Sequence, residues 1–154
     1  MKWDNIQEMP CSIARALSIV GDRWTLLILR DCFMGTKRFD QFQKQIGLSR
    51  HRLTDRLNKL VEHEILVKSP YQEKPLRHEY HLTRRGSALY PVLMTLAQWG
   101  DNWMAGKDGP PFEYIHTTCG HKTSVELSCS ECGETISSQD IAPKAGPGFK
   151  KSYL

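Results

Sequence analysis

Apolar residues recur at helical spacing through much of the first hundred residues of the chain. One set of such positions follows Pro10 and ends at Gly21, and a second set follows Asp22 and continues to Met34. Proline is tolerated in a first helical turn, and aspartate can cap the amino end of a helix. The pattern therefore predicts two successive helices that each bury one face.

Two further helices are predicted next, with a glycine-containing turn between them. Asp40 and Gln43 have the spacing of a capping box, which would open the first of the two. Gly47 then permits a tight turn, and Ser49 can cap a second helix that continues to about residue 63. Helix, short turn and helix in this order are typical of a helix-turn-helix unit.

The second of these helices has an apolar face and an exposed basic face. Leu53, Leu57 and Leu60 recur at helical spacing and face the core. Side chains that can donate hydrogen bonds gather near its amino end: Arg50, His51, Arg52, Thr54 and Arg56. Such donors can bind base edges and phosphates in a major groove, so this is the candidate recognition helix. A solvated basic helix in a bundle is the alternative.

A β-hairpin is predicted directly after the recognition helix. Residues 65–71 and 77–82 have the composition of strands, and residues 72–76 would connect them. A hairpin in this place is a wing, and we expect Lys74 and Arg77 near its tip to meet phosphate or enter a minor groove. Because an isolated hairpin is marginally stable, it must pack on the helices and belong to the same domain.

One more helix is predicted after Thr83, which can cap it. Its apolar positions from Leu89 to Trp103 form a broad face, and Pro91 would kink it early. That face exceeds what a small domain covers by itself, so dimerisation is the expected use. Packing against the first helices is the alternative.

The basic residues of the chain are concentrated in its centre. The net charge is +4, but residues 37–85 hold twelve Lys or Arg against six Asp or Glu. A basic centre suggests one face that binds a polyanion. There is no apolar run long enough to cross a membrane and no secretory signal, so a cytoplasmic location is expected. No nucleophile with a base or phosphate-binding glycine loop is visible, so an enzyme is not expected.

The composition changes after residue 106, where cysteines and histidines gather. His116 and Cys119 precede one glycine, and Cys129 and Cys132 precede another, each pair with two intervening residues. Two such loops suit a structural zinc ion in a small zinc-ribbon-like extension, with His121 as an alternative ligand. Reduced structural thiols, or a redox pair formed by the last two cysteines, are the other interpretations.

From Cys11 to about Met104 the chain resembles the HxlR family of winged-helix transcription factors, relatives of the MarR group. The ordered motifs that carry this resemblance are Gly21-Asp22-Arg23-Trp24, Arg38-Phe39, Leu53-Thr54-Asp55-Arg56-Leu57, Glu79-Tyr80-His81-Leu82-Thr83 and Trp99-Gly100. The resemblance implies a homodimer on a pseudo-palindromic operator. It also implies that the donors of the recognition helix read or clamp DNA.

Two interpretations of Cys11 stay open. Family members can carry a thiol at this place that senses oxidants or electrophiles. A helix amino end and Arg15 one turn later would both lower the pKa of the thiol. The alternative is a small buried side chain, which is also the interpretation of Cys32 on its apolar helix.

The predicted fold class is α+β, a winged helix-turn-helix domain with dimerisation helices over residues 1–106. A small β-rich extension over residues 107–142 and a flexible tail over residues 143–154 complete it. The expected function is transcriptional regulation on double-stranded DNA, and the alternative is a protein-interaction module built on a winged helix. The predicted DNA contacts are Arg38, Ser49, Arg50, His51, Arg52, Thr54, Arg56, Lys74 and Arg77. The sequence leaves open a small-molecule effector, the sign of regulation and the operator.

Overall fold

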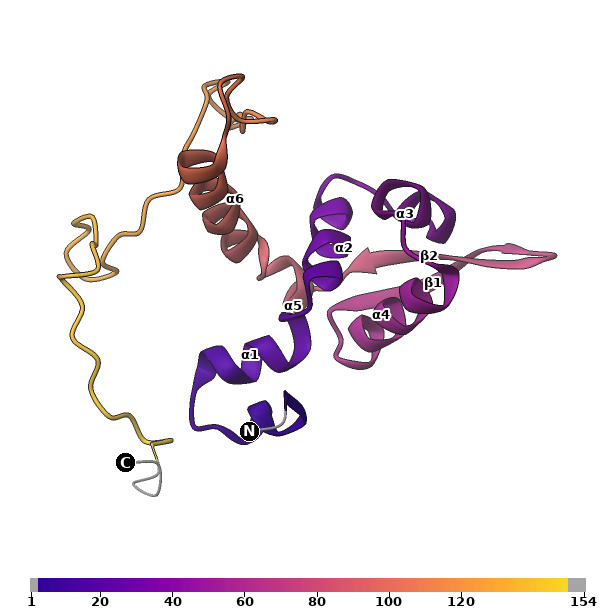
Figure 1. The fold of residues 1–154 in the computed structure, drawn as a ribbon, viewed down its shortest axis with the longest axis horizontal. Helices are drawn as coiled ribbons and strands as arrows, with labels where there is room; N and C mark the ends of the chain where they lie inside the picture. Colours follow the sequence, from indigo (N-terminus) through magenta and orange to yellow (C-terminus); the bar gives the residue numbers. More distant parts are fainter. Residues whose placement is uncertain (1–2, 150–154) are drawn as a thin grey trace. The chain divides into compact units, whose positions relative to one another are not determined.

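The computed structural model describes residues 3–149, which form helices and one two-stranded antiparallel sheet (Figure 1). The elements in chain order are η1 (Trp3–Glu8), α1 (Ser12–Val20), α2 (Arg23–Phe33), α3 (Phe39–Ile46), α4 (Arg50–Glu62), β1 (Leu66–Glu73), β2 (Leu76–Leu82), α5 (Arg84–Ser87) and α6 (Tyr90–Met104). Within the described range, no helix is long and apolar enough to cross a membrane.

Two compact units make up the described chain, residues 3–90 and residues 91–149. The division falls after Tyr90, so helix α6 groups with the C-terminal extension and not with the winged helix as the sequence suggested. One physical reason lies in Gln98 of α6, whose side chain donates to the carbonyl of Val125 (3.0 Å) and accepts from its amide (2.6 Å).

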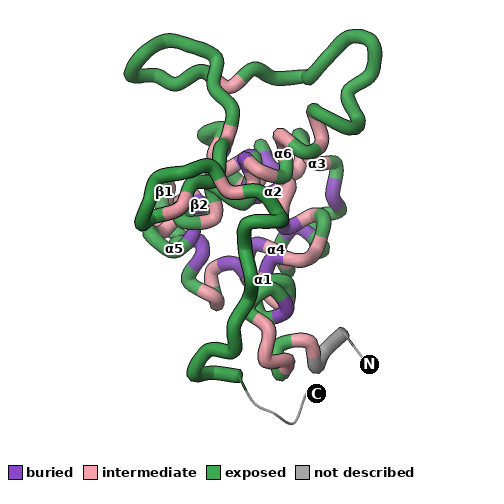
Figure 2. Tube along the Cα trace, turned by 90° about the vertical axis from the view of Figure 1, so that its left-hand side faces the viewer, coloured by how far each residue is buried: buried purple, intermediate pink, exposed green. Residues whose placement is uncertain are grey.

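The core of the first unit gathers the apolar faces of three helices, α2, α3 and α4, and the base of the hairpin. Fully buried side chains come from every element around it: Ile28 and Leu29 of α2, Phe42 of α3, Leu53, Leu57 and Leu60 of α4, and Leu66 of β1. Figure 2 shows buried positions recurring along these helices. Each fully buried side chain of this size stabilises the fold by about 1.5–3 kcal/mol. The predicted core-facing positions Leu53, Leu57 and Leu60 are among them, so the predicted apolar face of α4 is confirmed.

The helix-turn-helix unit forms as predicted, but its caps differ. Gly47 ends α3 in the left-handed region (φ 74°), and its amide donates to the carbonyl of Gln43. The predicted capping box at Asp40 is wrong, because α3 begins at Phe39 and the side chain of Gln41 accepts from the amide of Arg38. Ser49 is the N-cap residue of α4, yet its hydroxyl makes no capping hydrogen bond.

The hairpin is longer than predicted and projects well beyond α3 and α4 (Figure 1). Pairing extends from Leu66 opposite Leu82 to Glu73 opposite Leu76, with an irregularity between Pro70 and Gln72. The connection therefore shortens to two residues. The added strand positions are mostly polar, because this end of the hairpin covers no core. The alternation of apolar and polar residues therefore does not mark them as strand.

The chain after the hairpin forms two helices where one was predicted. Thr83 caps α5 as expected, since its hydroxyl accepts from the amide of Gly86 (3.0 Å). A Cβ atom on Gly86 would overlap the carbonyl oxygen of Ile65, so glycine is required there. Helix α5 ends at Ser87, and α6 begins at Tyr90 with Pro91 in its first turn, where proline is tolerated. Proline therefore marks a helix start and not a kink.

The C-terminal extension contains two bridged loops and no strand within the described residues. The bridges join Ile115 to Lys122 and Ser128 to Thr135. The β structure expected in the extension is thus limited to these two bridges. Each loop pairs only with itself, so no strand is long enough to form a sheet. Of the predicted tail, residues 143–149 are exposed and form no helix or strand, and residues 150–154 lie outside the described range.

Candidate nucleic-acid interface

Helix α4 presents a polar face whose direction is fixed by its buried leucines. Leu53, Leu57 and Leu60 are fully buried, so the residues between them point away from the core. The exposed residues at its amino end are Arg50, His51, Arg52, Thr54 and Asp55. The structure therefore brings together four of the predicted DNA contacts on one face.

The side chains at this end of α4 are held by local contacts. The Arg50 guanidinium lies 4.9 Å from the ring centroid of Phe39, a cation–π contact that joins α4 to α3. His51 Nδ1 lies 3.0 Å from a carboxylate oxygen of Asp55, one turn later. The Thr54 hydroxyl donates to the carbonyl of Arg50 at 2.9 Å. These contacts restrict the rotamers of side chains that remain open to a ligand.

A cleft of about 490 Å³ lies between the amino ends of α3 and α4 and the wing. The cationic residues of its lining are Arg38, Arg50, Lys68 and Arg77, with His78 beside them. Asp40 is the one carboxylate among the lining residues described, so the cleft is strongly cationic. Arginine guanidinium groups bind phosphate in a bidentate manner, and lysine binds it as a point charge. The cleft therefore suits an anionic backbone.

Arg38 is fixed on two sides at the wall of this cleft. Its Nε donates to Glu79 at 2.9 Å, and its guanidinium lies 4.4 Å from the ring centroid of Tyr71. The hydrogen bond from Arg38 lowers the pKa of the Glu79 carboxyl, so the acid stays ionised near neutral pH. The amide of Tyr80 also donates to the carbonyl of Lys37 (2.8 Å), which joins this segment to β2.

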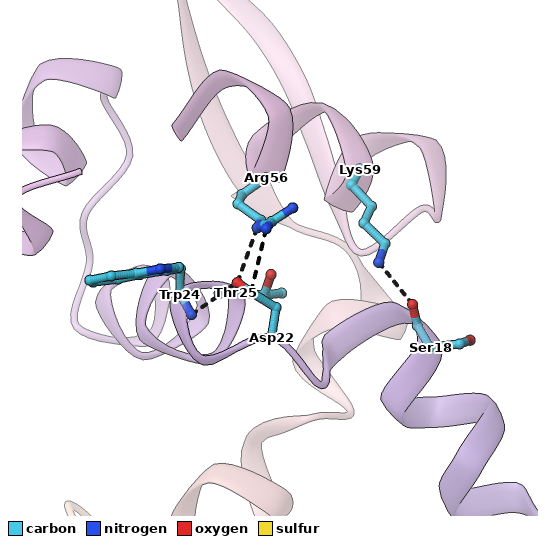
Figure 3. A network of polar contacts seen from close by, with 6 residues as sticks. All are labelled: Ser18, Asp22, Trp24, Thr25, Arg56 and Lys59. Carbon is cyan, nitrogen blue, oxygen red and sulfur yellow. Dashed lines mark hydrogen bonds and ion pairs between the residues drawn. The ribbon is translucent and has the colours of Figure 1, made fainter. Parts of the chain in front are cut away.

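Two polar contacts tie α4 to the junction of α1 and α2 (Figure 3). Arg56 Nε donates to Asp22 at 3.0 Å, and Asp22 also accepts from the amide of Trp24 as the cap of α2. One turn further along α4, Lys59 Nζ donates to the carbonyl of Ser18 at 2.8 Å. The Arg56 guanidinium is therefore engaged within the protein, which gives this residue a positioning role.

The tip of the wing carries the two remaining predicted contacts. Lys74 and Arg77 are both exposed, and the side chain of Gln72 donates to the carbonyl of Lys74 at 3.1 Å. Sequence reasoning missed Lys68 and His78, which the cleft also includes. Lys68 is the single basic residue of β1, but only the strand register, which sets it opposite Tyr80, places it at the cleft.

The cysteines of the first unit lie in different surroundings. Cys11 is half-buried and is the N-cap residue of α1, so it directly precedes the first turn where it was expected. The guanidinium of Arg15 donates to the Ser12 hydroxyl at 3.3 Å. Burial, and secondarily the Asp31 carboxylate, raise the pKa of the Cys32 thiol to about 12, as suits a core residue.

The predicted metal ligands of the extension lie in two pairs. His116 Nδ1 is 3.3 Å from Cys119 Sγ in the first loop. In the second loop, backbone amides of Cys132 and Glu131 lower the pKa of the Cys129 thiol. Nowhere in residues 3–149 do three His, Cys, Asp or Glu side chains gather as a metal site. The structure thus brings together the two residues of each pair, but it does not bring one pair close to the other.

Comparison with known proteins identifies the family. A family model for HxlR-like helix-turn-helix proteins matches residues 19–108, more than half of the chain. The chain belongs to the HxlR-like family. Over 139 residues it is 45% identical to an HTH-type transcriptional regulator of Mycobacterium tuberculosis, covering 90% of this chain and 88% of that protein. The predicted family is therefore confirmed, and this HxlR-like chain is a transcriptional regulator, in a family of regulators and not of enzymes.

Solved structures support the same conclusion for the fold. The crystal structure of PA1607, a candidate transcription factor, is 33% identical with a TM-score of 0.81, covering 91% of this chain and 98% of that one. The redox regulator HypR in its oxidised form is 27% identical with a TM-score of 0.56 and covers 60% of this chain and 96% of its own. The α+β winged-helix class is confirmed.

Proposed function

We propose that this regulator binds operator DNA as a homodimer, with α4 in the major groove and the wing on the backbone. The observation that carries the proposal is the cationic cleft of about 490 Å³ between the amino end of α4 and the wing. A recognition helix contacts base edges with its amino-terminal residues, while neighbouring cations bind phosphate.

The exposed side chains divide into two groups by their surroundings. Arg50, His51 and Arg52 are the proposed base-reading residues, because they are exposed at the first turn of α4. Thr54 follows on the same face, and the N-cap Ser49 is exposed beside it and suits a phosphate contact. The proposed backbone contacts are Arg38, Lys74 and Arg77, with Lys68 added by the structure. Arg56 acts through Asp22, by keeping α4 in place.

The homodimer is supported by the exposed apolar face of α6. Val92, Leu96, Trp99 and Trp103 follow one another at helical spacing and are between 49% and 77% exposed. A large exposed apolar patch indicates an interface, and a second copy of the chain is the proposed occupant. In such a dimer, two copies of α4 would meet half-sites separated by about one turn of DNA.

A response to thiol oxidation is the second part of the proposal. It is supported by the half-buried Cys11 at the amino end of α1 and by the similarity to HypR, a redox regulator. Hydrogen peroxide would oxidise the Cys11 thiol to a sulfenic acid, with water as the other product. The altered side chain would then no longer fit the start of α1.

Replacing Arg50 tests the direct role of α4 in reading sequence. We expect Arg50→Ala to weaken binding to a fragment of the protein's own promoter region by about 1–3 kcal/mol, with a smaller loss on unrelated DNA. Fluorescence anisotropy on both fragments, at several salt concentrations, measures the difference. An exposed lysine of the second unit provides the control in Lys144→Ala.

Two outcomes of this titration would contradict the proposal. Equal losses on both DNA fragments would make Arg50 a phosphate contact and not a base contact. Absence of salt-dependent DNA binding by the unmodified chain, together with a stable protein complex, would favour the protein-interaction module.

A further inference from the structure

The C-terminal extension contains an internal structural repeat. Residues 114–123 and residues 127–136 close their loops with the same three backbone hydrogen bonds, at 2.8–2.9 Å. In the first loop these bonds link His116 N to His121 O, Gly120 N to His116 O, and Thr123 N to Tyr114 O. In the second they link Cys129 N to Glu134 O, Gly133 N to Cys129 O, and Ile136 N to Leu127 O. The two loops therefore have one architecture.

This repeat aligns the side chains that could bind a metal. His116 corresponds to Cys129, and Cys119 corresponds to Cys132. The following glycine is left-handed in both loops, with φ of 73° at Gly120 and 76° at Gly133. Each loop thus places a nitrogen or sulfur ligand at its first and fourth positions, with a turn that only glycine adopts easily.

The separation within the first pair fits a shared metal ion. His116 Nδ1 lies 3.3 Å from Cys119 Sγ. A nitrogen and a sulfur bound to one tetrahedral zinc ion, at about 2.0 and 2.3 Å, are roughly 3.6 Å apart. The pair is therefore close to the geometry of two adjacent ligands.

The extension lacks an apolar core that could hold the loops together. From residue 105 to residue 149 no side chain is buried, and Figure 2 shows this segment exposed along nearly all its length. The half-buried residues of this segment are Tyr114, Val125, Cys129 and Ile136. A segment of about 40 residues without a core requires a metal, a disulfide or a partner to hold one structure.

We propose that one structural Zn²⁺ binds His116 and Cys119 of the first loop together with Cys129 and Cys132 of the second, drawing together two pairs that lie apart in the structure. Three thiolates and one neutral imidazole complete a tetrahedral shell with no open position, and each thiol gives up its proton on binding. The repeat aligns His121 with Glu134, outside the first and fourth positions of the loops, so His121 is not among the proposed ligands. This site is independent of the DNA interface of the first unit.

Metal analysis of the full-length protein tests the proposal. We expect about one zinc ion per chain after dialysis, and visible absorption typical of a tetrahedral thiolate site when Co²⁺ replaces it. Cys119→Ser, Cys132→Ser and His116→Ala should each weaken Co²⁺ binding by roughly 100-fold or more. The matched controls are His121→Ala and Cys32→Ser, which should bind the metal as the unmodified chain does.

Several outcomes would overturn the proposal. Protein isolated without metal, whose thiols are all reduced and which binds no Co²⁺, would show structural thiols only. A Cys129–Cys132 disulfide found by mass spectrometry in freshly isolated protein would show a redox pair. Loss of metal in His121→Ala but not in His116→Ala would overturn the ligand assignment. Circular dichroism of every variant separates loss of a ligand from loss of the helical fold.

Discussion

The chemical surroundings of each sulfur atom determine which thiol of the first unit can react. Only the thiolate is a strong nucleophile, so reactivity follows the pKa and the exposure of the group. Burial and the Asp31 carboxylate raise the pKa of the Cys32 thiol to about 12, so Cys32 is protonated near neutral pH. Cys11 is half-buried at the amino end of α1 and therefore remains in part accessible to an oxidant.

The proposed redox response is testable with a pair of cysteine variants. Mild peroxide should release the unmodified protein from its operator DNA, and Cys11→Ser should keep the DNA bound under the same treatment. Cys32→Ser should still be released, because the Cys32 thiol takes no part. Gel shifts before and after reduction measure the bound fraction. Release of Cys11→Ser by peroxide would assign the response to another thiol.

Sequence reasoning at this scale succeeded for side chains whose surroundings are local. The outward direction of Arg50 follows from the leucines within a turn or two of it, and the cap at Thr83 follows from its neighbours. Arg56 differs, because its partner Asp22 lies 34 positions earlier in the chain. No local pattern reveals such a pair, so the sequence assigned Arg56 to DNA alone.

The wing is an element whose exposed length makes its charges available to a polyanion. Its strands pair along residues 66–82, and its distal side chains are exposed. Each cation that binds a DNA phosphate releases about one condensed counterion, so binding weakens as salt increases. The number of wing contacts can therefore be measured from the salt dependence of affinity.

Wing variants should change this salt dependence in a countable way. We expect Lys74→Ala and Arg77→Ala each to lower the slope of log affinity against log salt by about one. Lys144→Ala, which removes an exposed lysine of the second unit, should leave the slope as it is. Anisotropy titrations over a range of salt concentrations give the slopes. Unchanged slopes for both wing variants would show that the wing does not touch the backbone.

Element boundaries show what the sequence could and could not predict. Helices α1 to α4 and both strands were predicted, because the spacing of their apolar residues indicates which face is buried. The hairpin end was missed because Gln72 and Glu73 pair there without burial, so no apolar signal marks the strand. The start of α3 was placed late because Asp40 is a good capping residue, whereas the structure uses the side chain of Gln41.

Helix α6 carries an exposed apolar face, as the proposed dimer requires. Its four apolar side chains are more exposed than a stable surface usually permits, and Trp103 is 77% exposed. Sequence periodicity predicted this face correctly. It did not predict that α6 belongs to the second compact unit, because the hydrogen bonds between Gln98 and Val125 join positions 27 residues apart.

Substitution on this face tests the dimer. Trp99→Asp and Trp103→Asp should each shift the protein from dimer to monomer in sedimentation velocity, and weaken binding to a palindromic operator by more than tenfold. Ile141→Asp, which alters an exposed apolar residue outside α6, is the matched control. A dimer that survives both tryptophan variants would assign the interface to another surface.

The two contacts in Figure 3 also bear on how the proposed redox response would reach α4. Lys59 and Arg56 bind the carboxyl end of α1 and the cap of α2, while Cys11 stands at the opposite end of α1. Helix α1 has nine residues and is about 13 Å long, so it connects Cys11 at one end to these contacts at the other. In the proposed redox response, a change at Cys11 that tilts α1 would strain the contacts of Lys59 and Arg56 and so shift α4.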